Sequence, residues 1–249
     1  MELNQLVEYL NGLLPSNSIE DEGLNGLQIA NSGEVKRIVF AVDASLEAIR
    51  QTGDEGAMLF VHHGLFWGRE RPITDLFYHR IKALFDADIA LYASHLPLDI
   101  HPVLGNSAQA ARRLKWPDPS EFGVYRGAFI GKKTRFPRQL PVSELQKSIE
   151  SELNCRIQPW LFGRNLLNSA AFVSGGGIGM LDQAIEEGID VLITGEPKHS
   201  YYWTAKEARI NVLFAGHYAT ETPGIRAVAE VAETDLDIET QVLDLPTGH

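Results

Sequence analysis

The sequence predicts an α/β protein made of two similar lobes, each with a mixed sheet flanked by helices. Short apolar runs alternate with segments of helical periodicity along most of the chain, a pattern typical of parallel or mixed sheets. In addition, residues 170–196 repeat the order found in residues 38–64, namely strand, small-residue turn, helix, glycine and strand. Phe172 aligns with Phe40 in this repeat, which indicates an internal duplication.

The lobe boundaries follow from where this alternation stops and restarts. We expect a first lobe over residues 1–115, to which a C-terminal segment returns, and a second lobe over 169–249. Between them, in residues 116–168, several prolines, among them Pro117, Pro119 and Pro137, and a basic stretch interrupt the rhythm of strands and helices. We therefore interpret residues 116–168 as a short connecting or inserted segment.

Hydrophobic periodicity and turn residues predict the individual elements. Apolar residues at helical spacing predict a first helix over residues 4–14, which ends at Pro15. Further on in the first lobe we expect strands over 37–42, 58–61 and 89–93 and helices over 46–52, 73–85 and 105–114. A helix is expected over 144–153 in the connecting segment, and the second lobe ends with a strand over 212–215, a helix over 222–233 with Pro223 in its first turn, and a strand over 237–245.

Composition narrows the class of protein. The chain has 249 residues, 44% of them hydrophobic and 22% charged, as in ordinary globular proteins. No apolar run approaches the roughly 20 residues of a membrane span, and the N-terminus lacks the basic region of a signal peptide. The single cysteine, Cys155, excludes a disulfide framework within the chain, so we expect a cytoplasmic protein. The net charge of -11 disfavours nucleic-acid binding but still permits a small anionic ligand.

Histidines and carboxylates follow three of the expected strands. Two adjacent histidines follow the first of these strands, and each of the other two is followed by a histidine with a carboxylate four residues later. These six residues are His62, His63, His95, Asp99, His217 and Glu221. Their nitrogen and oxygen donors suit Zn, Fe, Mn or similar divalent ions and are numerous enough for two of them.

The adjacent pair is the main test of a metal site, because a lone histidine at a strand end is more often structural. Neighbouring side chains of a strand point to opposite faces, so His62 and His63 can serve one site only if the strand has ended, which Gly64 allows. They could then ligate two ions about 3.5–4 Å apart that share a bridging carboxylate. We favour this metal site over structural histidines.

Three further stretches leave alternatives open. Lys198 follows another strand end and is a candidate contact for an anion, although an exposed loop is an equally good interpretation. The NGLQ stretch over residues 25–28 favours a tight turn over a direct role in the site. The glycine-rich run over 175–179 lacks the full dinucleotide-binding spacing, so we interpret it as a turn that allows close backbone approach.

Several motifs in combination resemble one known family. They are VHHG at 61–64, SHLPLD at 94–99, SGGG at 174–177, ITGE at 193–196 and GHYATE at 216–221. In this order they resemble the GTP cyclohydrolase I type 2 family, also called the NGG-interacting-factor-three-like family, over nearly the whole chain.

The resemblance implies a dinuclear metal centre in a cleft between the two lobes. It implies that His62, Asp99 and Glu221 hold one ion, and that His63, His217 and Glu221 hold the other, with Glu221 bridging. It also implies a toroidal homohexamer, built as a trimer of dimers.

The family name implies hydrolysis of GTP to formate and 7,8-dihydroneopterin triphosphate. In that reaction a metal-activated water would attack C8 of guanine and His95, beside the metals, could shuttle a proton. Candidate cations for the triphosphate are Lys198, Arg226 and the basic stretch over 132–138. Two alternatives stay open: a metal-dependent hydrolase of another nucleotide or phosphoester, and a non-enzymatic metal-binding interaction or regulatory protein.

Overall fold

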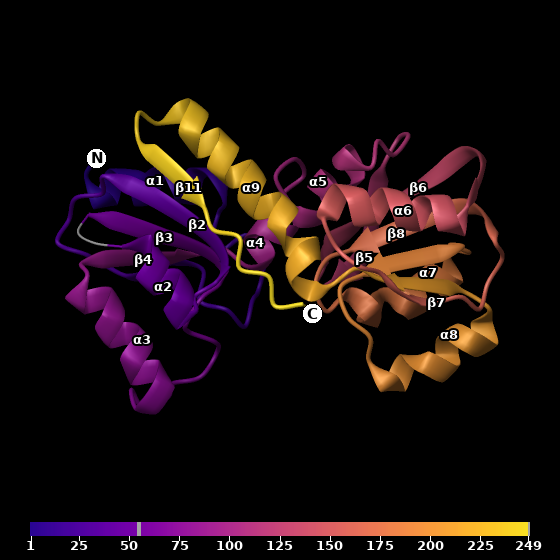
Figure 1. Cartoon of the computed structure of the whole chain (residues 1–249), viewed down its shortest axis with the longest axis horizontal. Helices are drawn as coiled ribbons and strands as arrows, with labels where there is room; N and C mark the ends of the chain where they lie inside the picture. Colours follow the sequence, from indigo (N-terminus) through magenta and orange to yellow (C-terminus); the bar gives the residue numbers. More distant parts are fainter. Residues whose placement is uncertain (54–55, 249) are drawn as a thin grey trace. The chain divides into compact units, whose positions relative to one another are not determined.

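The computed structural model describes residues 1–53 and 56–248. Their contacts divide the chain into two compact units, each of which contains one mixed sheet flanked by helices (Figure 1). Unit 1 comprises Met1–His101 and Ile225–Leu245, and unit 2 comprises Pro102–Gly224 with the last residues from Pro246 onward. The predicted fold class, two α/β halves with mixed sheets, is confirmed.

The sheet of unit 1 has the strand order β1-β4-β3-β2-β11. Its strands are β1 (Gly26–Ile29), β2 (Arg37–Asp43), β3 (Ala57–His63), β4 (Ile89–Ala93) and β11 (Glu239–Val242). Only β1 runs antiparallel to its neighbour; the other pairs are parallel. Because β3 lies in the middle with both faces covered, its residues from Ala57 to His62 are all buried, which explains the continuous apolar run in the sequence.

The two faces of this sheet are covered by different helices. The helices that lie wholly within unit 1 are α1 (Leu3–Leu13), α2 (Leu46–Thr52), α3 (Asp75–Asp86) and α4 (Leu96–Asp99). On one face, Leu59 of β3 shares a core cluster with Ile49 of α2 and Ile81 of α3. The residues that alternate with these along the strands point to the other face and form an aromatic row, in which Phe60 lies between Phe40 and Tyr92. The ring centroid of Phe60 is 5.2 Å from that of Phe40 and 5.4 Å from that of Tyr92. This alternation is the two-residue period of a strand.

Helix α9 (His217–Asp235) is divided between the units, since its residues up to Gly224 belong to unit 2 and those from Ile225 belong to unit 1. The predicted start at residue 222 was wrong, because Pro223 lies inside the helix and not in its first turn. Proline cannot donate to the carbonyl of Ala219, and the hydroxyl of Thr222 donates to that oxygen instead, at 3.1 Å.

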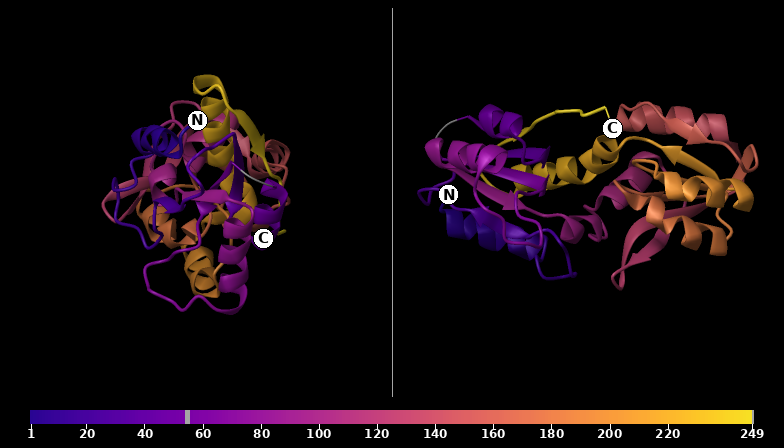
Figure 2. Two further views of the ribbon diagram at one scale, coloured as in Figure 1. Left: turned by 90° about the vertical axis from the view of Figure 1, so that its left-hand side faces the viewer. Right: turned by 90° about the horizontal axis from the view of Figure 1, so that it is seen from below.

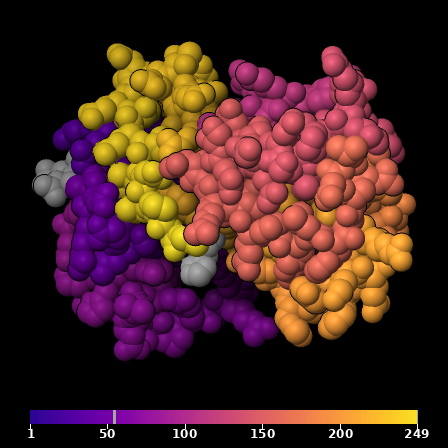
Figure 3. All heavy atoms as spheres, turned by 45° about the vertical axis from the view of Figure 1, so that its right-hand side comes forward, coloured from indigo at the N-terminus to yellow at the C-terminus, as the bar shows by residue number. Residues whose placement is uncertain are grey.

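After α9, β11 pairs with β2; Figure 3 shows the yellow surface of this returning segment beside the indigo N-terminal residues.

The sheet of unit 2 has the order β5-β6-β8-β9-β10-β7. Its strands are β5 (Ser120–Tyr125), β6 (Ala128–Pro141), β7 (Gln158–Trp160), β8 (Leu166–Val173), β9 (Val191–Thr194) and β10 (Asn211–Phe214). Strands β8, β9 and β10 are parallel and β7 is antiparallel to β10, just as β1 is antiparallel to β4 beside three parallel strands. The shared order supports the internal duplication.

The segment over 116–168 supplies β5, β6 and β7 to this sheet, together with helix α6 (Val142–Leu153). The remaining helices of unit 2 are α5 (Asn106–Arg113), η1 (Gly177–Met180), α7 (Leu181–Glu186), η2 (His199–Tyr201) and α8 (Tyr202–Ala208). Figure 2 shows these elements from two further directions. No helix within the described ranges combines the length and apolar character needed to cross a bilayer.

Candidate metal centre

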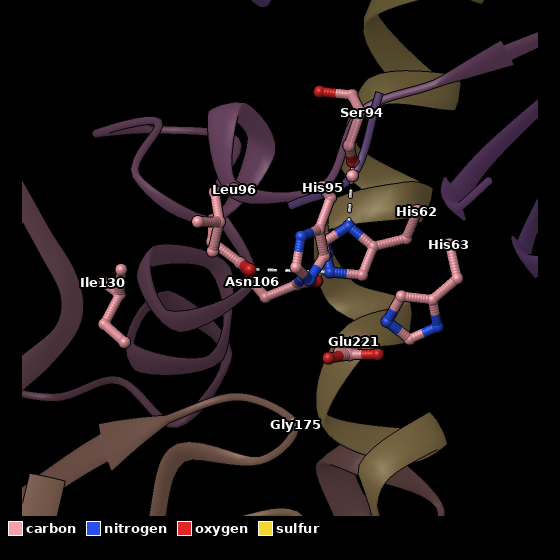
Figure 4. Close-up of polar contacts among 12 residues, drawn as sticks. His62, His63, Ser94, His95, Leu96, Asn106, Ile130, Gly175 and Glu221 are labelled. Atoms are coloured by element: carbon pink, nitrogen blue, oxygen red, sulfur yellow. Dashed lines mark hydrogen bonds and ion pairs between the residues drawn. The ribbon is translucent and has the colours of Figure 1, made fainter. Parts of the chain in front are cut away.

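His62 and His63 end the central strand of unit 1. The strand does not stop before them as expected, since β3 includes both residues and its register places His63 opposite Asp43. Their rings nevertheless lie with centroids 4.9 Å apart, tilted by 42° (Figure 4). His63 is the last residue of the strand and Gly64 lies outside it, so strict alternation need not hold at this end of the strand.

Each of these rings is oriented by a bond from its Nδ1 atom. The Nδ1 of His62, a completely buried residue, lies 2.9 Å from the carbonyl oxygen of Ser94, and its Nε2 lies 3.5 Å from Oδ2 of Asp99. The Nδ1 of His63 lies 2.9 Å from Oδ1 of Asp43. A histidine that donates Nδ1–H to a carbonyl or carboxylate presents Nε2 as a lone-pair donor, which is the usual arrangement of metal-ligating histidines.

His95 completes a cluster of three imidazoles in unit 1. One nitrogen from each of His62, His63 and His95 lies within 4.8 Å of the others, so these residues could hold a metal ion. The Nδ1 of His95 contacts both carboxylate oxygens of Asp21, at 3.0 and 3.1 Å. The family resemblance implies that His95 lies beside the metals. In the structure, His95 lies close enough to His62 and His63 to be a metal ligand itself.

Asp21 is an almost completely buried carboxylate that orients His95. Burial raises the pKa of this carboxyl group, but hydrogen bonds from His95, Asn25 and the backbone of Gly23 outweigh that effect and hold the pKa well below its usual range. The backbone N–H of Leu96 also donates to Asp21, at 3.0 Å. Asp21 is therefore ionised, and it favours the His95 tautomer with its proton on Nδ1.

In unit 2, His217 and Glu221 lie one turn apart at the start of α9. Nε2 of His217 lies 3.1 Å from Oε1 of Glu221, and Nδ1 lies 3.3 Å from Oε2 of Glu196. The hydrogen bond with Glu221 is the main reason that the pKa of His217 rises to about 9, against the opposing effect of burial. The two carboxylates around this imidazole favour a positive charge between them, which is carried by the protonated ring in the metal-free protein and could be supplied by a cation instead.

A glycine leaves the space in which Glu221 lies. Gly175, after β8, has a φ of +55°, and a Cβ there would lie 2.2 Å from Oε1 of Glu221 and 3.0 Å from Nε2 of His217. The backbone N–H of Gly175 donates to the Thr220 hydroxyl at 2.9 Å, and its carbonyl accepts from the Thr194 hydroxyl at 3.1 Å. The prediction of a glycine turn with close backbone approach is confirmed. The nitrogen and oxygen donors of His217 and Glu221, beside a glycine that leaves them space, fit a divalent ion.

Comparison with known proteins agrees with the sequence motifs. The family model for Duf34/NIF3 (NGG1p interacting factor 3) matches residues 1–247. The chain belongs to the Duf34/NIF3 family. Its relatives include proteins called "GTP cyclohydrolase 1 type 2 homolog" in Deinococcus radiodurans, 39% identical over 98% of this chain and 94% of the relative, and in Archaeoglobus fulgidus, 40% identical over all of both chains. Among solved structures, TTHA1606 from Thermus thermophilus has a TM-score of 0.88 and 34% identity over the full length of both chains.

The candidate substrate residues of this Duf34/NIF3 chain are not members of the ligand clusters just described. Lys198 is exposed in the loop between β9 and η2, and His199 beside it is also exposed. Arg226, in the part of α9 that belongs to unit 1, lies 3.7 Å from Asp244. In the basic stretch on β6, Lys133 forms an ion pair with Glu187 at 2.5 Å.

Sequence reasoning missed the residues that orient the histidines. The sequence did not identify Asp21, Asp43 and Glu196 as partners of the histidines, although each lies in or near one of the motifs or expected strands. The prediction of a tight turn over the NGLQ stretch was wrong, because Gly26–Ile29 forms strand β1 and pairs with β4. The amide oxygen of Asn25 accepts from the backbone N–H of His95 at 2.7 Å, and that of Gln28 accepts from the backbone N–H of Leu65 at 2.7 Å. Both amides therefore fix the loops that carry the histidines.

Proposed function

We propose that this protein is a dinuclear metal-dependent hydrolase that acts as a GTP cyclohydrolase, converting GTP and water to formate and 7,8-dihydroneopterin triphosphate. The observation that carries the proposal is the orientation of the imidazoles. His62, His63 and His95 are each held through Nδ1 by a carbonyl or carboxylate oxygen, which leaves three Nε2 atoms as donors. The names of the curated relatives support the choice of substrate.

In this proposal the donors of both units form one centre. His62, Asp99 and Glu221 would hold one ion, and His63, His217 and Glu221 would hold the other, with Glu221 shared by both. The mixed nitrogen and oxygen set supports Zn, Fe, Mn or a similar divalent ion. When bound, such ions supply Lewis acidity, which allows water to lose a proton near neutral pH.

The chain's own residues then move protons and bind substrate. Ionised Asp21 keeps the proton of His95 on Nδ1, so Nε2 can accept a proton from the attacking water and deliver it to a guanine ring nitrogen as the ring opens. Lys198, which is exposed, is proposed to bind the triphosphate. Arg226 is a second candidate because its 3.7 Å pair with Asp244 is long and partly exposed, and such pairs contribute little.

The test is the reaction itself. The purified full chain, loaded with each divalent metal in turn, is incubated with GTP while formate and the fluorescent pterin are measured. Glu221→Gln should abolish turnover, whereas Glu230→Gln, at an exposed position on the same helix, should leave it unchanged. Bound metal without product from GTP would refute the cyclohydrolase and direct the search to other nucleotides and phosphoesters. If no substrate in such a panel is turned over, a non-enzymatic metal-binding role replaces the hydrolase.

A further inference from the structure

Trp67 lies beside the imidazole cluster of unit 1 and has no role in the metal site. Its ring centroid is 5.0 Å from that of His95, with the rings edge to face at 73°, and 6.0 Å from that of His63. Yet 39% of the residue remains exposed. A large aromatic surface is thus presented to solvent directly beside two of the candidate catalytic or ligating rings.

The indole is fixed even though it is exposed. Its Nε1–H donates to the carbonyl oxygen of Gly64 at 2.9 Å, and the backbone of Trp67 forms an isolated β-bridge with Gly23. Gly23 also seats the ring, since a Cβ there would lie 3.3 Å from Cζ3 of the indole. The segment around Gly23 is the one that carries Asp21, so the same loop holds both Trp67 and the carboxylate that orients His95.

These constraints decide what the exposed ring can offer a ligand. The indole has one polar hydrogen, and Gly64 already accepts it, so the ring contributes only its π-face and its apolar area. A rigid aromatic side chain stacks on a ligand with little loss of conformational entropy. Stacking on such a face requires a planar ring and tolerates different ring substituents.

We propose that the exposed face of Trp67 is a stacking wall for a planar heteroaromatic ring of the purine or pterin class, and that it determines specificity by holding that ring beside His95. This inference rests on the proposed function, because it deepens the choice of substrate at the same site. It excludes ring-free phosphoesters as preferred ligands, which the metal centre alone would accept. The competing interpretation is that the indole only shields His95 and His63.

Binding of ring-containing and ring-free probes to the metal-loaded full chain tests this directly. The probes are guanosine, adenosine, ribose 5-phosphate and inorganic triphosphate, with dissociation constants from calorimetry. Trp67→Leu should weaken guanosine and adenosine binding about five- to 150-fold, the range that loss of base–aromatic stacking produces. The same variant should leave the affinity for inorganic triphosphate and the bound metal unchanged. Trp67→Phe should restore most of the nucleoside affinity.

The matched control is Trp203→Leu, which removes another exposed tryptophan, from α8 of unit 2, and should change none of these values. Guanosine should quench tryptophan emission in the wild type, and this quenching should vanish in Trp67→Phe. Unchanged nucleoside affinity in Trp67→Leu overturns the stacking wall. Loss of bound metal from a Trp67 variant that remains folded also overturns it, and shows instead that the indole shields His95 and His63. Nucleoside binding that depends on Trp67 without GTP turnover would refute the cyclohydrolase and keep the stacking wall.

Discussion

Substitution of Gly175 by alanine tests whether the space beside Glu221 is needed for the metal centre. At a φ of +55°, the left-handed conformation costs an L-residue with a Cβ about 1–2 kcal/mol. The new Cβ would also lie 2.2 Å from Oε1 of Glu221, so the carboxylate must retreat by at least about 1.3 Å to reach the roughly 3.5 Å of ordinary contact. Metal–ligand distances tolerate only about 0.2 Å.

Two separate losses are therefore expected. The backbone penalty should lower the melting temperature by about 2–8 °C, given about 2–4 °C per kcal/mol for a chain of this size. The displaced carboxylate should weaken metal binding at least 10- to 100-fold, roughly the loss that follows when the support of a metal ligand is disturbed. Thermal unfolding of the metal-free protein measures the first effect, and calorimetric titration with Zn²⁺ or Mn²⁺ measures the second.

Gly188→Ala is the matched control. Gly188 also has a positive φ, +65°, but nothing lies within 4 Å of a Cβ built there. This variant should therefore lose stability to a similar extent through the backbone alone and keep its full metal affinity. If Gly175→Ala binds metal as tightly as Gly188→Ala, Glu221 is not a ligand held in place by the glycine, and the reasoning fails.

The remaining predictions concern positioning, protonation and assembly. Asp21→Asn should lower kcat for GTP about 10- to 100-fold with little change in bound metal, since it replaces the ionised carboxylate that orients His95, a residue outside the proposed ligand set; unchanged kcat would show that this orientation is unimportant. The pKa of His217 is raised in the folded state to about 9, so its ion pair stabilises the metal-free protein fully below pH about 6.5 and this stability is lost as pH rises through about 9. His217→Asn should flatten that pH profile in urea unfolding, and a profile identical to the wild type would contradict the assignment. Light scattering after size exclusion should give about six times the chain mass of 27.6 kDa, and a monomer or dimer would refute the proposed homohexamer.

The sequence revealed the strands and their polar ends because those signals are local. The buried run that leads to His62 is continuous, and a continuous apolar run ended by glycine predicts a central strand without further information. The duplication was likewise visible as a repeated order of elements, and the matching strand orders of the two sheets support it.

What the sequence did not reveal depends on pairing between distant segments. Asp43 contacts His63 only because β2 and β3 pair in one particular register, and Asp21 reaches His95 across 74 residues. Neither contact has a local signature. The start of α9 was placed too late because Pro223 is a strong signal for a first turn, whereas a threonine hydroxyl here satisfies the carbonyl that the proline leaves without its donor.

The dinuclear centre can be tested directly by anomalous diffraction from crystals of the metal-loaded full chain, recorded at the absorption edge of the bound metal. We expect two anomalous peaks per chain about 3.5–4 Å apart, both contacted by Glu221, one also by His62 and the other by His63 and His217. Peaks that avoid Glu221, a single ion held by His62, His63 and His95 alone, or no peak at all would contradict the dinuclear centre.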